Sequence, residues 1–326
     1  MTDRKEISVG GQAVIEGVMM RGPDALATAI RRKDGSIELL KTPFISKTQT
    51  VKAFKLPIVR GFVSLIEMML IGIKTLTFSA SRFELDLIEE EKEKGKKIKT
   101  KSKAAQKMEE ILSYIFAFGL AFLLFGLLPY KLSDWMNLSK QDFFFNLFAG
   151  GIRIVFFVLY VWLISLMKDV KRLFRYHGAE HKNVSAYENN DRLLIAEIQK
   201  NSTIHPRCGT SFMFFVLLTA TLIFSITDTL VSAFILKGPV PMFLRLGYHF
   251  LMLPIISGVS YEVLKFSGRN MKHPIVKLMT IPGMALQRIT TQPPDDSMVE
   301  TALVAMKAAL DMDYSKHNVV LLPEAK

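Results

Sequence analysis

The sequence contains a single cysteine, Cys208, among 326 residues. One cysteine excludes an intramolecular disulfide and therefore a fold held together by disulfides. Acidic residues are also scarce, because 30 Asp and Glu face 42 Lys and Arg and leave a net charge of +12. No nucleic-acid recognition motif accompanies this charge, which argues against a nucleic-acid-binding protein.

The N-terminal stretch MTDRKEISVGGQAVIEG has no long apolar core and no small-residue cleavage site, so we expect no cleavable signal peptide. The chain also shows no internal repeat, which argues against a transporter built from two related halves. Apolar residues, in contrast, are abundant: 50% of the chain is hydrophobic and the mean hydropathy is +0.26. This composition indicates a membrane protein, and the positive charge indicates contact with anionic lipids of the cytoplasmic leaflet.

Four apolar segments approach the length of about 20 residues that a helix needs to cross a bilayer. They are residues 111–128, 143–167, 212–236 and 243–264. Three of these segments contain ionisable residues, which are costly in lipid unless they are paired or lie in a wet cavity. We expect Asp228 to reach the membrane interface, and Glu262 to form a structural ion pair with Arg153 or Lys265.

The distribution of basic residues predicts how these segments are oriented. The link 168–211 contains eight Lys and Arg, whereas the short links 129–142 and 237–242 together contain three. The stretches before the first span and after the last are also basic. We therefore expect a multi-pass membrane protein whose N-terminus, C-terminus and 168–211 link all face the cytoplasm.

A fifth apolar segment, residues 56–80, carries Arg60, Glu67 and Lys74 at intervals of seven residues. This spacing places the three charges on one helical face. We therefore expect an amphipathic helix that lies on the membrane or packs against the spans, in preference to a fifth span. Residues 86–107, which follow it, are rich in charge and predict a solvated helix or a linker.

Two regions predict ordered structure outside the membrane. Residues 9–42 contain alternating runs on both sides of Asp34-Gly35, a strong hairpin signal, and predict a small antiparallel sheet. Glycines flank its first strand, in GGQAVIEG, and would let that strand approach a site closely. Near the C-terminus, the periodic segment 299–313 predicts a helix, with Asp295 among the capping residues that precede it.

These elements define the expected fold class: a mainly α-helical polytopic membrane protein with about four transmembrane helices, a small N-terminal cytoplasmic β-sheet and an amphipathic helix. The expected regions are a β-rich region (1–55), the amphipathic helix and basic linker (56–110), the first two spans (111–167), a cytoplasmic link with a His/Cys cluster (168–211), the last two spans (212–264) and a cytoplasmic C-terminal region (265–326).

The most informative motif is RYHGAEHK, at residues 175–182. In a helix His177 and His181 lie one turn apart on one face, where two imidazoles can share a metal ion, and Glu188 continues that face. HGAEH also fits the H-x-x-E-H pattern of inverted zinc peptidases, in which the glutamate activates a bound water. Glu180 is therefore the candidate catalytic base.

A second polar motif, HPRCGTSF at residues 205–212, lies at the far end of the same link, where the third span begins. Its His205 and Cys208 extend the potential ligand set of His177 and His181, with Glu188 in reserve, and these donors suit zinc. Three interpretations remain open. The residues hydrogen-bond the link to the membrane surface, or four of them close a structural zinc site, or three ligands leave a position for water with Glu180 as base.

Four separated motifs resemble the YqhQ-like family of bacterial membrane proteins: GGQAVIEGVMMRGP, YHGAEHK, HPRCGTSF and ITTQPPDDSMVETALVAMKAAL. The resemblance extends over nearly the whole chain. It implies a protein of the bacterial cell membrane and the label of predicted metal-dependent enzyme, which refers to residues such as His177, Glu180, His181, His205 and Cys208. It implies no particular substrate.

Two functions follow as hypotheses. The first is a zinc-dependent hydrolase with its site at the cytoplasmic membrane interface. The second is a non-catalytic factor that scaffolds other membrane proteins or assists their biogenesis, in which the His/Cys cluster is structural. In either case the expected partners are membrane lipids, together with other membrane proteins in the second, and no nucleic acid.

Overall fold

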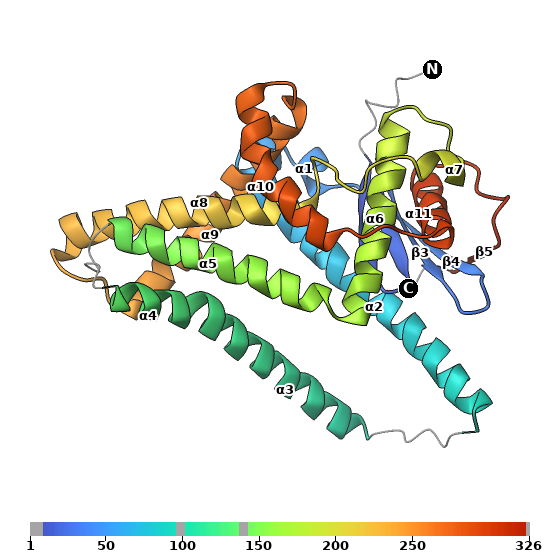
Figure 1. The fold of residues 1–326 in the computed structure, drawn as a ribbon, viewed down its shortest axis with the longest axis horizontal. Coiled ribbons are helices and arrows are strands. Elements are labelled where there is room, and N and C mark those ends of the chain that lie inside the picture. The colour runs from blue at the N-terminus through green and yellow to red at the C-terminus, as the bar shows by residue number, and fades with distance from the viewer. Residues whose placement is uncertain (1–8, 96–101, 137–142, 324–326) are drawn as a thin grey trace.

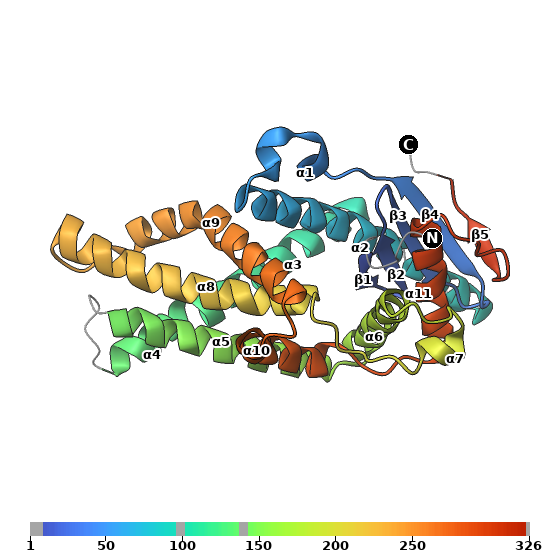
Figure 2. The ribbon, with the colours of Figure 1, turned by 90° about the horizontal axis from the view of Figure 1, so that it is seen from above.

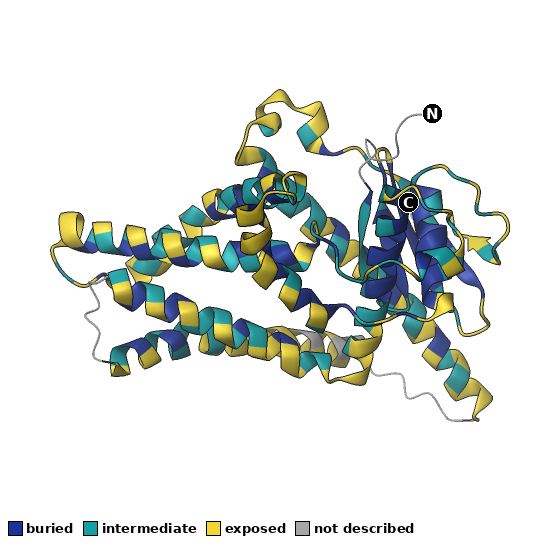
Figure 3. Ribbon diagram, turned by 45° about the horizontal axis from the view of Figure 1, so that its top comes forward, coloured by how far each residue is buried: buried dark blue, intermediate teal, exposed yellow. Residues whose placement is uncertain are grey.

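The computed structural model describes residues 9–95, 102–136 and 143–323. The fold has two parts, an elongated bundle of helices at one end and a β-sheet with helices on both faces at the other (Figures 1 and 2). Exposed residues cover much of the bundle surface, while buried residues concentrate in the sheet and the helices against it (Figure 3). Helices long and apolar enough to cross a membrane would present such exposed residues to lipid, whereas the sheet unit packs around a buried core.

Five helices in the described residues are long and apolar enough to cross a membrane, compared with about four expected. Four of them form the bundle, and each contains all or nearly all of one of the segments predicted to span. The first member of the bundle is α3 (Lys103–Phe122), which the π-helical turn η3 (Leu123–Leu127) and α4 (Leu128–Trp135) continue. The second is α5 (Phe143–Ser165). The third is α8 (Gly209–Leu230), which the π-helical turn η4 (Val231–Leu236) continues, and the fourth is α9 (Met242–Arg269).

The predicted antiparallel sheet is present and forms a meander. Its strands are β1 (Gly10–Val14), β2 (Gly17–Arg21), β3 (Ala25–Arg31) and β4 (Ile37–Pro43). The Asp34-Gly35 turn joins β3 to β4, with Gly35 at φ +85° and the Asp34 carboxylate accepting a hydrogen bond from Ser36 N. A further strand that the sequence did not predict, β5 (Val319–Leu321), pairs in parallel with β4.

Helices cover both faces of this sheet. The main hydrophobic core lies between the sheet and two helices, α6 (Lys168–Glu188) and α11 (Asp296–Ala309), and includes Met20, Tyr176 and Leu303. Asp295 caps α11 by accepting a hydrogen bond from Met298 N, in agreement with its predicted capping role. On the opposite face, Met19 packs against α2 (Val59–Glu93). The remaining helices are α1 (Lys47–Thr50), η2 (Lys52–Lys55), α7 (Ile195–Ile198) and α10 (Pro274–Thr290).

The helix α2, which contains most of the fifth apolar segment, joins the two parts of the fold. At its start Gly61 lies against α9, where a Cβ would meet Gly258 Cα at 2.9 Å, and Arg60 Nε donates to Glu262 at 2.6 Å. Further along, Asp86 pairs with Arg32 of the sheet. The helix therefore packs against α9, a candidate span, which is one of the two arrangements expected. The ion-pair partner of Glu262 is Arg60, and not Arg153 or Lys265 as predicted. Residues 96–101 of the predicted linker lie outside the described residues.

Asp228 of α8 has its partners inside the bundle. It is 2% exposed. Its carboxylate accepts a hydrogen bond from His249 Nε2 at 2.7 Å and lies 3.3 Å from Arg245 Nε, both on α9. Asp228 is therefore buried among polar partners, in contrast to the interfacial position expected from the sequence.

The sheet and its covering helices come from three parts of the chain that bundle helices separate. The first four strands precede the bundle, α6 lies between α5 and α8, and α11 with β5 follows α9. Parts of one folded unit lie on one side of a membrane, so an even number of crossings must separate them. If α3–α4, α5, α8 and α9 each cross, as their length and composition allow, the first pair supplies two crossings and the second pair two more. A further crossing by α2 would make the first number odd and would place β1–β4 and α6 on opposite sides.

Candidate metal centre

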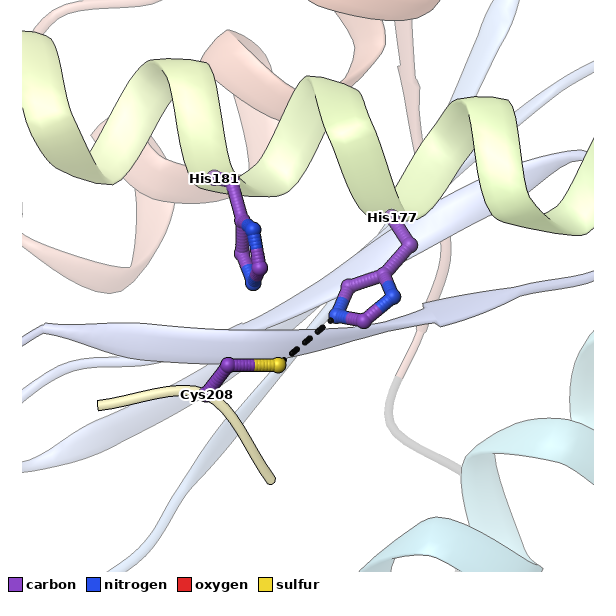
Figure 4. A group of neighbouring side chains, drawn as sticks. All are labelled: His177, His181 and Cys208. Carbon is purple, nitrogen blue, oxygen red and sulfur yellow. Dashed lines mark hydrogen bonds between the residues drawn. The ribbon is translucent and has the colours of Figure 1, made fainter. Parts of the chain in front are cut away.

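Three potential ligands converge where α6 meets the start of α8 (Figure 4). His177 and His181 project from α6, and Cys208 immediately precedes α8. One ligand atom from each residue lies within 4.8 Å of the other two. His177 Nε2 and Cys208 Sγ are 3.3 Å apart, whereas the ligand atoms of a tetrahedral zinc ion are separated by about 3.5 Å. The separation of this pair suits two ligands of one metal ion, and the three residues together form a group that could hold one.

Backbone carbonyl groups orient both histidine rings. His177 Nδ1 lies 2.9 Å from the carbonyl oxygen of Thr290, and His181 Nδ1 lies 2.5 Å from that of Thr203. A carbonyl oxygen only accepts hydrogen bonds, so Nδ1 of each ring is the donor, and the neutral ring in this tautomer has its lone pair on Nε2. Metal-binding histidines are typically fixed in this way by a partner of their second nitrogen.

Cys208 is the N-cap of α8. Its Sγ accepts a hydrogen bond from Thr210 N at 3.4 Å and lies 3.1 Å from Thr210 Oγ1. These contacts fix the position of the sulfur at the start of the helix. The buried Gln287 of α10 holds the preceding loop, since its side chain accepts from His205 N and donates to His205 O, both at 2.9 Å.

Glu180 lies beside the three ligands. Its Oε1 accepts a hydrogen bond from Gly11 N at 2.8 Å, and its Oε2 is 3.5 Å from His181 Nε2. The glycine-rich first strand thus approaches the cluster through Gly11. The Glu180 side chain is 7% exposed, so bulk water has little access to it. A carboxylate held here can accept a proton from a water molecule at the centre.

His205 and Glu188 lie outside the three-ligand group. His205 Nε2 is 3.3 Å from Glu188 Oε2, and Glu188 also pairs with Arg207. The rings of His181 and His205 are 5.9 Å apart, so His205 is a neighbour of the cluster. Burial lowers the pKa of His205, although the charge of Glu180 acts in the opposite direction. In this geometry three residues of the described chain group as potential ligands, compared with up to five candidates in the sequence.

Gly178 lies between the two histidines, and only glycine fits there. A Cβ on Gly178 would lie 2.1 Å from the carbonyl oxygen of Gln292, and Gln292 N donates to Phe174 O at 2.9 Å. The chain that leaves α10 therefore crosses α6 in direct backbone contact, which brings Thr290 to His177. A glycine within a helical pattern can signal such a packing role. Here the close backbone contact outweighs the cost of glycine in a helix, which is about 1 kcal/mol relative to alanine.

Sequence reasoning missed three positioning residues, namely Thr203, Thr290 and Gln287. The two threonines act through backbone carbonyl oxygens, which every residue has, so their side chains give no signal. Gln287 is fully buried, and an amide among the apolar residues of a largely apolar segment was the available signal, because a buried amide requires partners.

Residues 56–312 match a family model described as "Protein of unknown function (DUF1385)". The chain belongs to this family. It is also 32% identical to a protein of Bacillus subtilis (strain 168) named "Uncharacterized protein YqhQ", over 95% of this chain and 97% of the relative. These matches confirm the YqhQ-like resemblance, and neither printed description states an activity. No solved structure matches the chain.

Proposed function

We propose that this protein is a membrane-embedded, zinc-dependent hydrolase with His177, His181 and Cys208 as ligands and Glu180 as general base. The observation that carries the proposal is the convergence of three ligand atoms within 4.8 Å, with both histidine rings fixed through Nδ1. Nitrogen and sulfur donors suit zinc, and three protein ligands leave the fourth position open, as in catalytic zinc sites.

The chemistry divides between the metal and the chain. Zinc supplies Lewis acidity to a bound substrate. Glu180 accepts the proton of the attacking water and can return it to the leaving group, while Gly11 N holds its other oxygen in place. Both Glu180 and His181 are buried, so the proton transfer takes place with little competition from bulk water.

We place the site at the cytoplasmic face of a bacterial cell membrane. Cys208 lies at the start of α8, one of the helices long enough to span, and α6 belongs to the sheet unit. The excess of Lys and Arg in the link 168–211 favours the cytoplasm for this unit. A scissile bond at the membrane surface, in a lipid-embedded substrate or a membrane protein, lies at the right depth for this centre.

A structural metal centre in a scaffolding factor is the second candidate. The observation in its favour is the position of the cluster, which joins α6 of the sheet unit to α8 of the bundle (Figure 4). A metal ion there would fix the two parts of the fold to each other, because its binding free energy contributes to folding. The two candidates differ in what they require of Glu180, since a structural site has no use for a base.

The deciding experiment is complementation of a deletion strain by Glu180→Gln. Glutamine retains the size of the side chain and an oxygen for Gly11 N, but it cannot act as a base. The hydrolase predicts normal zinc content, normal abundance and lost cellular function. The matched control is Glu188→Gln, which changes another α6 carboxylate outside the ligand group and is expected to complement. Full complementation by Glu180→Gln would refute the hydrolase and leave the structural centre.

A further inference from the structure

The helix α10 follows α9 and crosses α8 at the end of the bundle that is nearer the sheet (Figure 1). One face of this helix is held by two candidate spans. Leu286 packs in an apolar cluster with Phe157 and Val161 of α5, and Gln287 Nε2 donates a hydrogen bond to Ser211 Oγ of α8 at 2.8 Å. These contacts fix α10 to the side of the bundle.

The remaining surface of α10 is divided into an apolar face and a basic edge. Ile275, Leu278 and Met279 are 62%, 67% and 50% exposed, and their spacing of i, i+3 and i+4 puts them on one face. Lys277 and Arg288 are also exposed, and the interval between them, about three turns, puts them on one side of the helix. At 100° per residue, the face on the bundle, the apolar face and the basic edge are roughly 120° apart.

The contacts of α10 with the bundle also determine its depth. Phe157 and Val161 lie eight and four residues before the end of α5 at Ser165, and Ser211 is the third residue of α8. The contacts are therefore within about 12 Å of the helix ends that face the sheet. Where α5 and α8 cross a membrane, as their length and composition allow, this level lies within one leaflet, whose apolar part is about 15 Å thick. Because α10 crosses α8 steeply (Figure 1), its apolar face stays near this level.

The charge around α10 is of one sign. Between Glu262 and Asp295 the chain contains five Lys and Arg and no acidic residue. Helices that lie in the plane of a membrane interface combine such basic residues with an apolar face. Their Lys and Arg side chains keep the aliphatic part in apolar surroundings and extend the charge to the anionic headgroups.

We propose that α10 is an interfacial helix that binds the anionic lipid surface of the leaflet nearer the sheet. The face formed by Ile275, Leu278 and Met279 contacts acyl chains, and Lys277 and Arg288 contact headgroup phosphates. A second copy of the chain is the competing occupant of this face. Charge argues against it, because two copies would each bring a basic edge and a net charge of +12 to the contact.

Quenching by brominated lipids tests the apolar face. The full chain is labelled with a fluorophore at Leu278→Cys and placed in vesicles of phosphatidylcholine brominated on its acyl chains, which should remove most of the fluorescence. Ile275→Cys gives a second position on the same face. The matched control is Leu194→Cys, which replaces a leucine of the sheet unit that is 58% exposed and should not be quenched. The wild type, whose Cys208 is buried, gives the background. Quenching at 278 and 275 no greater than at 194 would overturn the proposal, whether water or a second copy covers the face.

Brominated phosphatidylglycerol tests the basic edge. In mixed vesicles it should quench the label at residue 278 more efficiently than brominated phosphatidylcholine does. Lys277→Gln and Arg288→Gln should lower this preference by up to about five-fold for each lost charge, while retained quenching by phosphatidylcholine shows that α10 is still in place. Lys316→Gln, which removes an exposed lysine of the sheet unit, should not change the preference. An equal preference in the wild type and the double variant would overturn the role of anionic headgroups. Neither measurement depends on metal or on hydrolysis, so the proposal is tested separately from the hydrolase.

Discussion

His177 donates a hydrogen bond through Nδ1 to the carbonyl oxygen of Thr290, a residue 113 positions further along the chain, at 2.9 Å. This contact joins α6 of the sheet unit to the end of α10, which packs along the bundle. It also leaves His177 Nε2 free to face Cys208. One backbone group thus orients a ligand and connects the two parts of the fold.

Metal content provides the first prediction. We expect about one zinc ion per chain to copurify, and His177→Ala, His181→Ala or Cys208→Ser to lower the affinity by orders of magnitude, because each removes one of three protein ligands. Elemental analysis of the purified variants measures this. The control is His205→Ala, which is expected to keep most of the zinc since the His205 side chain contacts Glu188. Full zinc retention in a His177→Ala, His181→Ala double variant would contradict every metal-based role.

The second prediction concerns Gly178. Gly178→Ala should lower the stability by roughly 1–3 kcal/mol, as overpacking usually does, and should also lower zinc affinity. The added Cβ meets Gln292 O at 2.1 Å and pushes the 290–292 segment, with Thr290, away from α6. Thermal unfolding and zinc content measure the two effects. Gly151→Ala is the control, because a Cβ on that helical glycine of α5 would point into open space and the substitution should not destabilise. Equal stability of the two variants would exclude the proposed backbone contact.

Membrane topology provides the third prediction. Single cysteines at Asp34, Lys94 and Glu197 should react with a membrane-impermeant reagent from the same side, and a cysteine at Lys237 from the other side. The first three lie in the β3–β4 turn, at the end of α2 and in α7, respectively. If α2 does not cross the membrane, Asp34 and Lys94, which lie on either side of it in the sequence, are on the same side of the membrane. The native Cys208 is buried and should give little background. Reaction of Asp34 and Lys94 from opposite sides would show that α2 spans the membrane.

The fourth prediction concerns acid stability of the sheet unit. Burial raises the pKa of Glu300, but hydrogen bonds from His317 and Arg31 outweigh it, so the net pKa is lowered. A carboxyl group with a lowered pKa in the folded state stabilises the fold above its unfolded pKa of about 4.3 and loses this contribution as the pH falls through the folded value. Glu300→Gln should therefore destabilise at pH 7 and make little difference at strongly acidic pH. Thermal unfolding across pH, with the mostly exposed Glu89→Gln as control, checks this; a constant effect at every pH would contradict it.

Local patterns predicted much of this fold. The apolar segments gave the four bundle helices, Asp34-Gly35 gave the β3–β4 turn, and the periodic segment after Asp295 gave α11. Each is specified by residues that lie near one another in the sequence. The parallel pairing of β5 with β4 joins residues 282 positions apart, and no pattern within either strand specifies such a partner. The sequence also did not predict that α2 packs on both α9 and the sheet, because these contacts too join segments that are distant in the sequence.

The candidate site was predicted in its chemistry and less well in its geometry. The motifs contain the three residues that the structure groups as potential ligands, but spacing alone did not distinguish His205 from His177 as a candidate ligand. The difference arises from contacts between distant segments. Glu188 contacts His205 Nε2 and pairs with Arg207, whereas the carbonyl oxygen of Thr290 orients the ring of His177. The charged residues of the spans were also identified, but the partners of Asp228 and Glu262 depended on how the helices pack.

The division of the sheet unit among three parts of the chain also determines when the unit can form during synthesis. The first four strands leave the ribosome early, but the helix that completes their main core, α11, begins only at Asp296. The metal ligands are likewise complete after Cys208, while the carbonyl group that orients His177 arrives with Thr290. The candidate metal centre therefore acquires all of its positioning contacts only after α9 has been synthesised, and a metal ion bound there, as proposed, would mark a chain whose long apolar helices are complete.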